Sequence, residues 1–303
     1  MDEKQRKGLE RMGGKEIRFD CPMTQYTTFR VGGHVDTLYF ARDLKELQQV
    51  LSYLGENHIP YLIVGKGSNL LVKNGGFNGV AIILREKLAT IELGGENDEI
   101  LVAGGGLSIT KLLTQCSRKG LGGLEFLAGI PGTVGGAVAM NAGAFGNDIG
   151  SMVQEIQVIT RQGDLATINR SQLKFSYRKS SIPEGTVITE ARFQLNCETP
   201  EMVAERMADY LRRRKANQPM EYPSAGSVFK NPSNDYAGRL IEKVGLKGRR
   251  IGGAMISPKH ANYIVNTGGA RAADILALME LAREKVREET GIELEPEIRV
   301  IGG

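Results

Sequence analysis

Short runs of β-branched, aliphatic and aromatic residues recur along the chain, while elsewhere apolar residues recur every three or four positions. The first pattern is typical of strands and the second of amphipathic helices. Strands are predicted at 35–40, 61–64, 70–72, 79–84, 100–103, 153–160, 186–195, 251–258 and 292–301. Helices are predicted at 43–55, 108–119, 200–211, 236–244 and 274–290. Strands interspersed with helices in this way predict an α+β chain whose first part is a mixed α/β domain.

The length of 303 residues exceeds that of one average domain. The alternation of strands and helices ends near Asn196, and Pro200 opens a new predicted helix. We therefore expect a first region, 1–196, with two parts at about 1–86 and 87–196, followed by a smaller domain, 197–303. The last predicted strand contains Pro296, which cannot donate to a ladder, and is expected at a sheet edge.

A glycine-rich segment, 122–146, is nearly free of charged residues. Its glycines permit backbone angles and close approaches that side chains would forbid. One interpretation is a buried series of tight turns and short apolar strands. The other is a row of backbone N–H donors that holds phosphates or carbonyl groups of a flat ligand.

A second glycine segment, 65–69, interrupts an aliphatic run and predicts a polar loop between two strands. Its backbone donors, hydroxyl, amide and single cation suit a pyrophosphate. Neither standard nucleotide fingerprint is present, because Lys66 is followed by Gly67 and Leu70 stands where a third glycine would be required.

Other polar segments allow both structural and functional interpretations. Taken alone, Tyr177 and Arg178 predict a polar loop, Ser227 a serine that caps a turn, and Glu297 an ion pair with Arg299. The segment 223–232, P-S-A-G-S-V-F-K-N-P, predicts an ordered loop that leads into a short strand.

Several basic or polar residues also remain ambiguous. The run 212–215, R-R-R-K, is either a solvated helix end favoured by the helix dipole or an attractor of nucleotide phosphates. Arg30 is either a surface arginine beside a turn or a residue that faces a cofactor or substrate. His260 and Asn262 are either structural groups or contacts to phosphate or uracil.

Composition excludes several classes of function. The formal net charge of +4 is too small to indicate nucleic-acid binding, although it is compatible with anionic small molecules. Three widely separated cysteines without C-x-x-C spacing indicate a reducing compartment and no metal site. The charged first 16 residues contain no apolar segment typical of a signal peptide, so a cytoplasmic protein without membrane insertion is expected.

Five motifs carry a resemblance to a known family. G-K-G-S-N-L-L at 65–71 and G-I-P-G-T-V-G-G-A at 129–137 resemble segments of the UDP-N-acetylenolpyruvoylglucosamine reductases, the MurB flavoenzymes of bacterial cell-wall synthesis. F-x-Y-R-x-S at 175–180, A-G-S-x-F-K-N-P at 225–232 and P-E-x-R at 296–299 follow in the family's order. The resemblance extends from about Thr27 to Ile301. It implies an FAD-binding mixed α/β domain of the vanillyl-alcohol-oxidase (PCMH) type, followed by a smaller α+β substrate-binding domain whose last strand contributes to the active site. The chain lacks room for an additional substrate-covering loop, so it resembles the shorter, second type.

The resemblance also implies roles for individual residues. Both glycine segments would bind FAD through Gly65, Lys66, Gly67, Ser68, Asn69, Leu70, Gly129, Ile130, Pro131, Gly132, Thr133, Gly135 and Gly136. The catalytic residues would be Arg178, Ser227 and Glu297. Tyr177, Lys230, Asn231 and His260 would lie near the nucleotide substrate.

The implied activity is reduction of UDP-N-acetylglucosamine enolpyruvate to UDP-N-acetylmuramate in peptidoglycan precursor synthesis, which serves cell-wall biogenesis, cell shape and cell division. NADPH, inferred from the family alone, would reduce FAD in the cleft that the substrate uses in turn. Hydride would come from flavin N5, as cofactors carry the hard step. Arg178 and a protonated Glu297 would stabilise charge on the substrate carboxylate, and Ser227 would supply the proton. No obligatory protein partner is implied.

Two alternatives remain at this point. A flavin-dependent oxidase or dehydrogenase of the same superfamily would share the FAD domain and act on another substrate. A non-catalytic nucleotide-binding protein would need neither Ser227 nor Glu297.

Overall fold

The computed structural model describes residues 1–94 and 99–303, and these residues form two compact units. Unit 1 comprises Met1–Asp20, Asp36–Gly65 and Gly79–Arg212, and unit 2 comprises Cys21–Val35, Lys66–Asn78 and Arg213–Gly303. Each unit is therefore built from separated parts of the sequence. The predicted boundary at Asn196 between an FAD-binding region and a substrate-binding domain stays a prediction.

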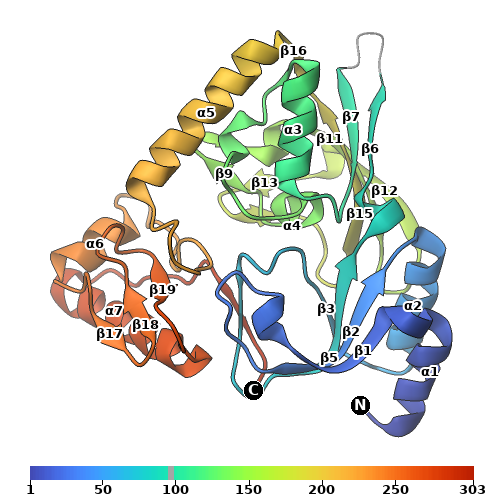
Figure 1. Ribbon diagram of the computed structural model, residues 1–303, viewed down its shortest axis with the longest axis horizontal. Helices are drawn as coiled ribbons and strands as arrows, with labels where there is room; N and C mark the ends of the chain where they lie inside the picture. The colour runs from blue at the N-terminus through green and yellow to red at the C-terminus, as the bar shows by residue number, and fades with distance from the viewer. Residues whose placement is uncertain (95–98) are drawn as a thin grey trace. The chain divides into compact units, whose positions relative to one another are not determined.

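Unit 1 is built around two sheets (Figure 1). The first has the strand order β1-β2-β5-β3, and its members are β1 (Ile17–Pro22), β2 (His34–Ala41), β3 (Tyr61–Ile63) and β5 (Phe77–Leu84). The second has the order β12-β11-β15-β7-β6, and its members are β6 (Ile91–Gly94), β7 (Ile100–Gly104), β11 (Val153–Ile159), β12 (Leu165–Asn169) and β15 (Val187–Gln194). All neighbouring pairs of the second sheet are antiparallel, whereas β3 and β5 pair in parallel.

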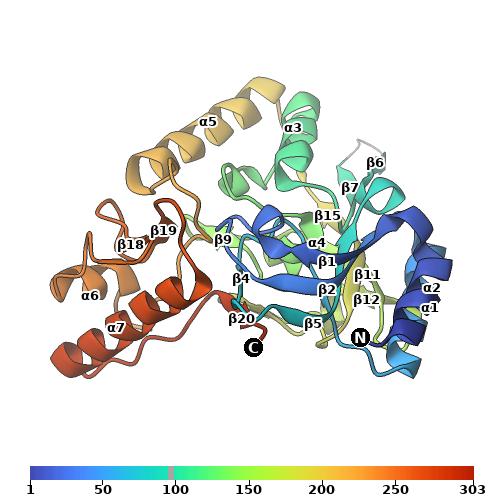
Figure 2. The same ribbon diagram turned by 60° about the horizontal axis from the view of Figure 1, so that its bottom comes forward.

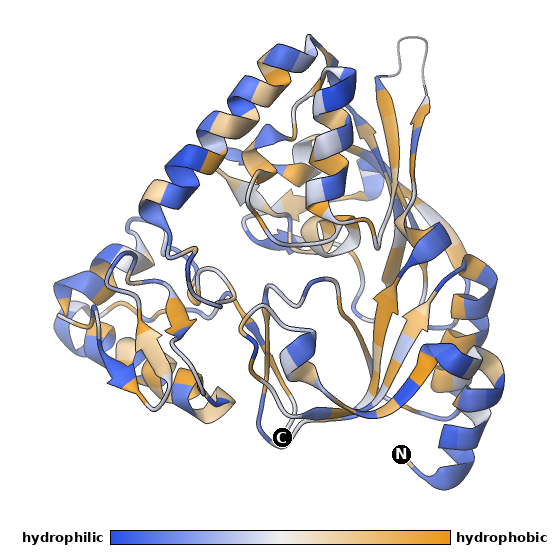
Figure 3. Ribbon diagram, viewed as in Figure 1, coloured by the Kyte–Doolittle hydropathy of each residue, from blue (hydrophilic) through white to orange (hydrophobic). Residues whose placement is uncertain are grey.

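Helices cover the sheets of unit 1 with their apolar faces. Helices α1 (Glu3–Gly13) and α2 (Leu44–Glu56) share one buried core with the first sheet. Helices α3 (Ile109–Lys119) and α4 (Val134–Ala139) contribute to a second core with the five-stranded sheet. Figure 3 shows hydrophobic residues concentrated on the strands, while α1 carries mainly hydrophilic ones. Burial of these faces drives the packing of helix on sheet.

Short hairpins and one long helix complete this part of the chain. The two-residue strands are β8 (Leu121–Gly122), β9 (Gly143–Ala144), β10 (Asn147–Asp148), β13 (Phe175–Ser176), β14 (Lys179–Ser180) and β16 (Asn196–Cys197). Helix α5 (Pro200–Asn217) is fixed to unit 1 by Arg206, whose guanidinium contacts Glu125 at 2.5 Å and Glu198 at 2.7 Å.

Unit 2 is a smaller α+β assembly (Figure 2). Its three-stranded sheet has the order β17-β18-β19, with β17 (Arg250–Ile251), β18 (Ala254–Ile256) and β19 (Ile264–Asn266). Helices α6 (Ala237–Lys243) and α7 (Ala272–Thr290) pack with this sheet in one apolar core. Strand β20 (Arg299–Ile301) pairs in parallel with β4 (Leu70–Val72), which joins the C-terminal segment to a part of the chain more than 200 residues earlier.

Most predicted elements are confirmed, and the structure shows how several helices are capped. The Asp43 carboxylate accepts from the Glu46 N–H at the start of α2, and Ser108 caps α3 in the same way. Gly291 ends α7 with a φ of 70°. At the end of α5, Arg212 contacts Asp209, whereas Arg214 is buried and donates to Gln218, so the basic run is not a fully solvated helix end.

Other predictions need correction. Helix α1 and strands β1, β6 and β12 were not predicted, and the glycine segment contains the short helix α4 rather than only turns and strands. The predicted strand 251–258 is a hairpin of β17 and β18. Of the predicted strand 292–301, only β20 is regular, and Pro296 makes a single bridge to Phe229 instead of a ladder.

Candidate functional site

The loop that carries Ser227 is held on both sides within unit 2. Ser227 forms a β-bridge with Tyr263, and the Val228 N–H donates to the Asn262 carbonyl oxygen at 2.9 Å. On the other side, Phe229 bridges to Pro296. Val228 and Phe229 are buried, while Ser227 is half-buried. The serine hydroxyl is therefore carried by a backbone that packing and hydrogen bonds fix from both directions.

Glu297 lies directly beside this loop. Its N–H donates to the Val228 carbonyl oxygen at 2.8 Å, one residue from Ser227. The Asn69 side-chain amide donates to the Glu297 carbonyl oxygen at 3.1 Å, and Arg299 N–H donates to the Asn69 carbonyl oxygen at 2.9 Å. Unit 2 thus brings together three predicted site residues that are far apart in sequence: Asn69, Ser227 and Glu297.

The loop 66–69 presents donors without protein acceptors. Within the described residues, no acceptor is found for the backbone N–H groups of Lys66, Gly67, Ser68 and Asn69. Gly67 has a φ of 60°, and a Cβ there would lie 2.2 Å from the Tyr26 carbonyl oxygen, so only glycine permits this close approach. Successive unpaired N–H groups of this kind form an anion-binding concavity.

Gly65 and the predicted cofactor residues of the segment 129–136 belong to unit 1, whereas Leu70 belongs to unit 2. A Cβ on Gly65 would lie 2.5 Å from Thr133 Oγ1. Thr133 caps α4 by accepting from the Gly136 N–H at 3.4 Å, and Gly135 N–H donates to the Gly105 carbonyl oxygen at 2.9 Å. The N–H groups of Gly129, Gly132 and Thr133 have no acceptor in the part of the chain that the structure describes.

These features fit FAD. Its pyrophosphate requires several N–H donors, which the loop 66–69 offers within unit 2, and its flat rings require surfaces that side chains leave open. Ile130 and Pro131, between the donors of the second segment, add apolar surface, and Leu70 is buried where β4 begins. The residues present therefore suit the cofactor that the sequence predicts.

We expect the substitution Gly65→Ala to weaken FAD binding by at least about tenfold. The new Cβ would displace the Thr133 side chain and disturb the cap of α4, and overpacking of this kind costs roughly 1–3 kcal/mol. FAD released on dilution, followed by flavin fluorescence, measures the effect. Gly94→Ala is the matched control, because nothing lies within 4 Å of a Cβ at that position. Equal FAD retention by Gly65→Ala and Gly94→Ala would contradict the prediction.

Arg178 stands at the tip of the β13–β14 hairpin of unit 1. Its φ of 55° is unusual for a residue other than glycine. The guanidinium Nη1 donates to the Gly143 carbonyl oxygen at 3.0 Å, and the guanidinium carbon lies 5.1 Å from the centre of the Tyr177 ring. Tyr177 itself is 52% exposed. The hairpin thus presents an arginine and an exposed aromatic ring side by side.

Asn141 supports this hairpin and was not identified from the sequence. Its side chain is buried, donates to the Ser176 carbonyl oxygen at 3.0 Å and accepts from the Gly150 N–H at 3.0 Å. The Ser180 hydroxyl adds a bond of 2.8 Å to the Ala139 carbonyl oxygen. A buried amide with both groups satisfied fixes local backbone geometry. The only sequence signal was a polar residue inside an apolar glycine segment.

The residues expected near the nucleotide lie in unit 2, apart from Tyr177. Lys230 forms an ion pair with Glu295, whose side chain is 69% exposed. The Asn231 side-chain oxygen accepts from the Ala237 N–H at 3.1 Å at the start of α6. Exposed ion pairs contribute little to stability, so a phosphate can replace Glu295 beside Lys230 at small cost.

His260 and Asn262 have structural roles in unit 2. Asn262 is buried, accepts from Phe229 N–H at 3.0 Å and donates to the Phe229 carbonyl oxygen at 2.7 Å. His260 Nδ1 accepts from the Asn262 N–H at 3.2 Å, and its ring meets Tyr263 edge-on at 4.9 Å. Asn262 therefore holds the Ser227 loop, and His260 in turn holds Asn262.

Burial lowers the pKa of His260 below its usual value, and nearby Lys247 lowers it further while Glu242 opposes the shift. The unfolded chain therefore binds this proton at a higher pH than the folded chain. The contribution to stability is fully present above a pH of about 6.5 and is lost as pH falls through the folded-state pKa. In urea unfolding, we expect wild type to lose more free energy of unfolding than His260→Gln between pH 7.5 and pH 5. Parallel losses in the two proteins would contradict this assignment.

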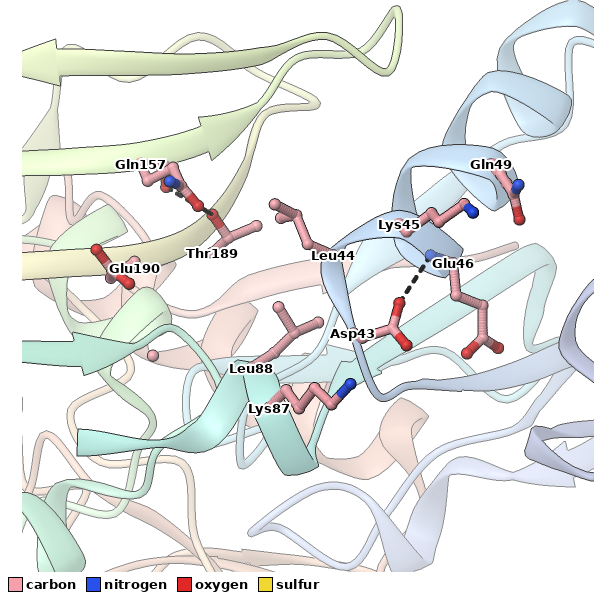
Figure 4. Close-up of a pocket in the computed structure, with 11 residues that line it drawn as sticks. Asp43, Leu44, Lys45, Glu46, Gln49, Lys87, Leu88, Gln157, Thr189 and Glu190 are labelled. Atoms are coloured by element: carbon pink, nitrogen blue, oxygen red, sulfur yellow. Dashed lines mark hydrogen bonds between the residues drawn. The ribbon is translucent and has the colours of Figure 1, made fainter. Parts of the chain in front are cut away.

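A groove of about 720 Å³ lies on unit 1 away from the predicted site residues (Figure 4). Its lining is polar and of mixed charge: Asp43, Leu44, Lys45, Glu46, Gln49, Lys87, Leu88, Gly104, Gln157, Thr189 and Glu190. Burial, with Glu92 and Glu155 nearby, raises the pKa of Glu190. No predicted cofactor, catalytic or substrate residue belongs to this groove.

Other kinds of site receive no support from the described residues. Across 1–94 and 99–303, no cluster of histidine, cysteine, aspartate or glutamate could hold a metal ion. The three cysteines in these ranges are free thiols, and burial raises the pKa of Cys116 to about 12, which removes its nucleophilicity at neutral pH. No helix in the same ranges is long and apolar enough to cross a membrane.

Comparison with known proteins identifies the class and then the family. Residues 35–169 match the FAD binding domain family, and residues 218–301 match the C-terminal domain of UDP-N-acetylenolpyruvoylglucosamine reductase. With the cofactor-binding geometry of the glycine segments, the first match defines an FAD-dependent oxidoreductase.

Similarity to individual members extends along the whole chain. A UDP-N-acetylenolpyruvoylglucosamine reductase of Geobacter metallireducens is 44% identical, over 95% of this chain and 94% of its own. A Clostridium botulinum (strain Hall) reductase is 41% identical, over 96% and 94%. The crystal structure of the reductase (MurB) from Thermus caldophilus is 38% identical with a TM-score of 0.82, over 94% of this chain and all of that one. The chain belongs to the UDP-N-acetylenolpyruvoylglucosamine reductase family. The predicted fold class is confirmed.

Proposed function

We propose that this protein reduces the enolpyruvyl ether of UDP-N-acetylglucosamine to UDP-N-acetylmuramate in the cytoplasm, with NADPH as the electron donor. The observation that carries the proposal is the match of residues 218–301 to the C-terminal domain of this reductase family. An oxidase that shared only the FAD domain would not require that match. The product is a precursor of peptidoglycan.

In this proposal, bound FAD supplies the hydride-transfer chemistry. Ser227 gives the proton to the carbon next to the one that receives the hydride. A hydroxyl is a weak acid, so it acts only beside a strongly basic intermediate and where water is excluded. The doubly supported backbone of the 223–232 loop favours the fixed position that this role demands.

The remaining catalytic residues act on the substrate carboxylate. The Arg178 guanidinium suits it because its planar fork can hold both oxygens. A protonated Glu297 would donate a second hydrogen bond as negative charge builds up there. Each such donor often contributes about 3–4 kcal/mol to a transition state. The backbone of Glu297 is held by bonds to Val228 and Asn69.

The nucleotide would be bound directly by Tyr177, Lys230 and Asn231. Lys230 provides a cation whose ion-pair partner, Glu295, can be replaced by a substrate phosphate. We assign His260 an indirect role, because its Nδ1 atom already accepts from the Asn262 N–H. Residues 1–196 would serve FAD, and residues 197–303 would serve the UDP-sugar.

Product analysis tests the proposal. The purified protein with FAD, NADPH and UDP-N-acetylglucosamine enolpyruvate should yield a nucleotide heavier by two hydrogen atoms, with equal consumption of NADPH. Consumption of NADPH that depends on oxygen and leaves the enolpyruvyl nucleotide unchanged would indicate a flavin oxidase with another substrate. No consumption of NADPH by the flavin-loaded protein would overturn the choice of reductant.

A further inference from the structure

Arg30 occupies a strained position in unit 2. Its φ is 55°, in the left-handed region that disfavours a residue with a Cβ. The turn is closed by a bond of 3.1 Å from the Arg30 N–H to the Thr27 carbonyl oxygen. Phe29 and Val31, on either side, are 0% and 2% exposed. Buried neighbours thus hold the backbone of an exposed arginine where glycine or asparagine would fit with less strain.

The charge of Arg30 is not compensated by the protein. Within 1–94 and 99–303, no carboxylate lies within ion-pair distance of its guanidinium, and the same holds for Lys66. Strain that persists at an exposed polar residue is more frequent at ligand-binding positions than elsewhere.

The turn that carries Arg30 contacts the loop 66–69 directly. The Thr28 N–H and hydroxyl donate to the Gly67 carbonyl oxygen at 3.3 and 3.4 Å. Gly67 also approaches the backbone of Tyr26 and Thr27 so closely that a Cβ would collide with both. Two cations, Arg30 and Lys66, are therefore carried by adjoining turns beside a row of unpaired N–H groups.

We propose that Arg30 binds the pyrophosphate group of a nucleotide, in addition to the loop 66–69. A doubly charged pyrophosphate matches two cations and several N–H donors better than a single carboxylate does, and guanidinium binds phosphate oxygens in a bidentate manner. The inference rests on the proposed function, in which both FAD and the UDP-sugar carry a pyrophosphate. Loss of the Arg30 side chain would release the strained turn from the nucleotide and weaken nucleotide binding.

The test compares Arg30→Gln and Arg30→Lys with Arg249→Gln, which removes another exposed arginine of unit 2. In the flavin-loaded protein, we expect Arg30→Gln to weaken the binding of one nucleotide by roughly 10- to 100-fold. Arg30→Lys should bind that nucleotide with an affinity between those of wild type and Arg30→Gln, and Arg249→Gln should bind it like wild type. Faster release of FAD on dilution assigns Arg30 to FAD. A raised Kd for UDP-N-acetylglucosamine enolpyruvate, measured from the flavin absorbance, assigns it to the substrate. The difference between Arg30→Gln and wild type, in FAD release or in the Kd of the substrate, should shrink at high salt.

Arg30→Gly adds a signature that a structural role would not give. This substitution should raise the thermal midpoint of unfolding, because it relieves the backbone strain, and it should still weaken nucleotide binding. Wild type that binds both nucleotides, with Arg30→Gln equal to wild type for each, would overturn this inference alone. Wild type that binds neither nucleotide would overturn the proposed function as well.

Discussion

Replacement of Ser227 by alanine is expected to leave reduction of the flavin by NADPH intact and to slow reoxidation by the enolpyruvyl nucleotide by about 10²–10⁴-fold. Loss of a positioned proton donor has this magnitude. The substitution removes one hydroxyl from a half-buried site, while the backbone keeps its bridge to Tyr263 and the bonds of Val228 to Asn262 and Glu297. Stability and FAD content should therefore stay close to those of wild type.

Stopped-flow absorbance of the flavin measures the two half-reactions of Ser227→Ala separately. Ser224→Ala is the matched control, since Ser224 is half-buried in the same loop and has no proposed role. A variant that reoxidises at the wild-type rate would remove Ser227 from the mechanism. Equal slowing of both half-reactions would indicate a disturbed cofactor site instead.

Glu297→Ala is expected to lower the rate of the second half-reaction by about 10²–10³-fold, with a smaller effect on substrate affinity. Removal of one donor to a developing oxyanion has this effect. The backbone bonds of Glu297 to Val228 and Asn69 do not involve its carboxyl group, so the loop should remain in place. Glu297→Gln keeps a weaker N–H donor and should give an intermediate rate.

The control for Glu297 is Glu293→Ala. Glu293 is a nearby, exposed glutamate whose partner, Arg283, lies on α7. The rates of reoxidation at saturating nucleotide should separate the two variants clearly. If Glu297→Ala raised only the Kd of the nucleotide and left the saturating rate unchanged, Glu297 would bind substrate without assisting the chemistry.

Local features of the fold were predictable because they depend on nearby residues. Asp43 and Ser108 as caps and Gly291 as a stop follow from hydrogen bonds within one turn. The apolar stripe of α2 follows from periodicity, although Val50 rather than Leu44 belongs to its buried face. By contrast, β12 lies at a sheet edge and contains no fully buried residue, so its sequence lacks the apolar run that marks the other strands.

The arrangement of the candidate site depends on long-range pairing that periodicity does not encode. The parallel pair of β20 with β4 places Asn69 beside Glu297. The bond from Glu297 to Val228 then places this acid next to Ser227. The motifs indicated these residues individually, whereas Asn262 and Asn141, which support them, are short polar residues without a motif of their own.

The most direct test of the central claim is the anaerobic absorbance spectrum of the flavin-loaded protein, first with NADPH and then with UDP-N-acetylglucosamine enolpyruvate. We expect the flavin band to bleach with NADPH and to return in full with one equivalent of the enolpyruvyl nucleotide. A band that bleaches and stays bleached after addition of the nucleotide would contradict the assigned substrate.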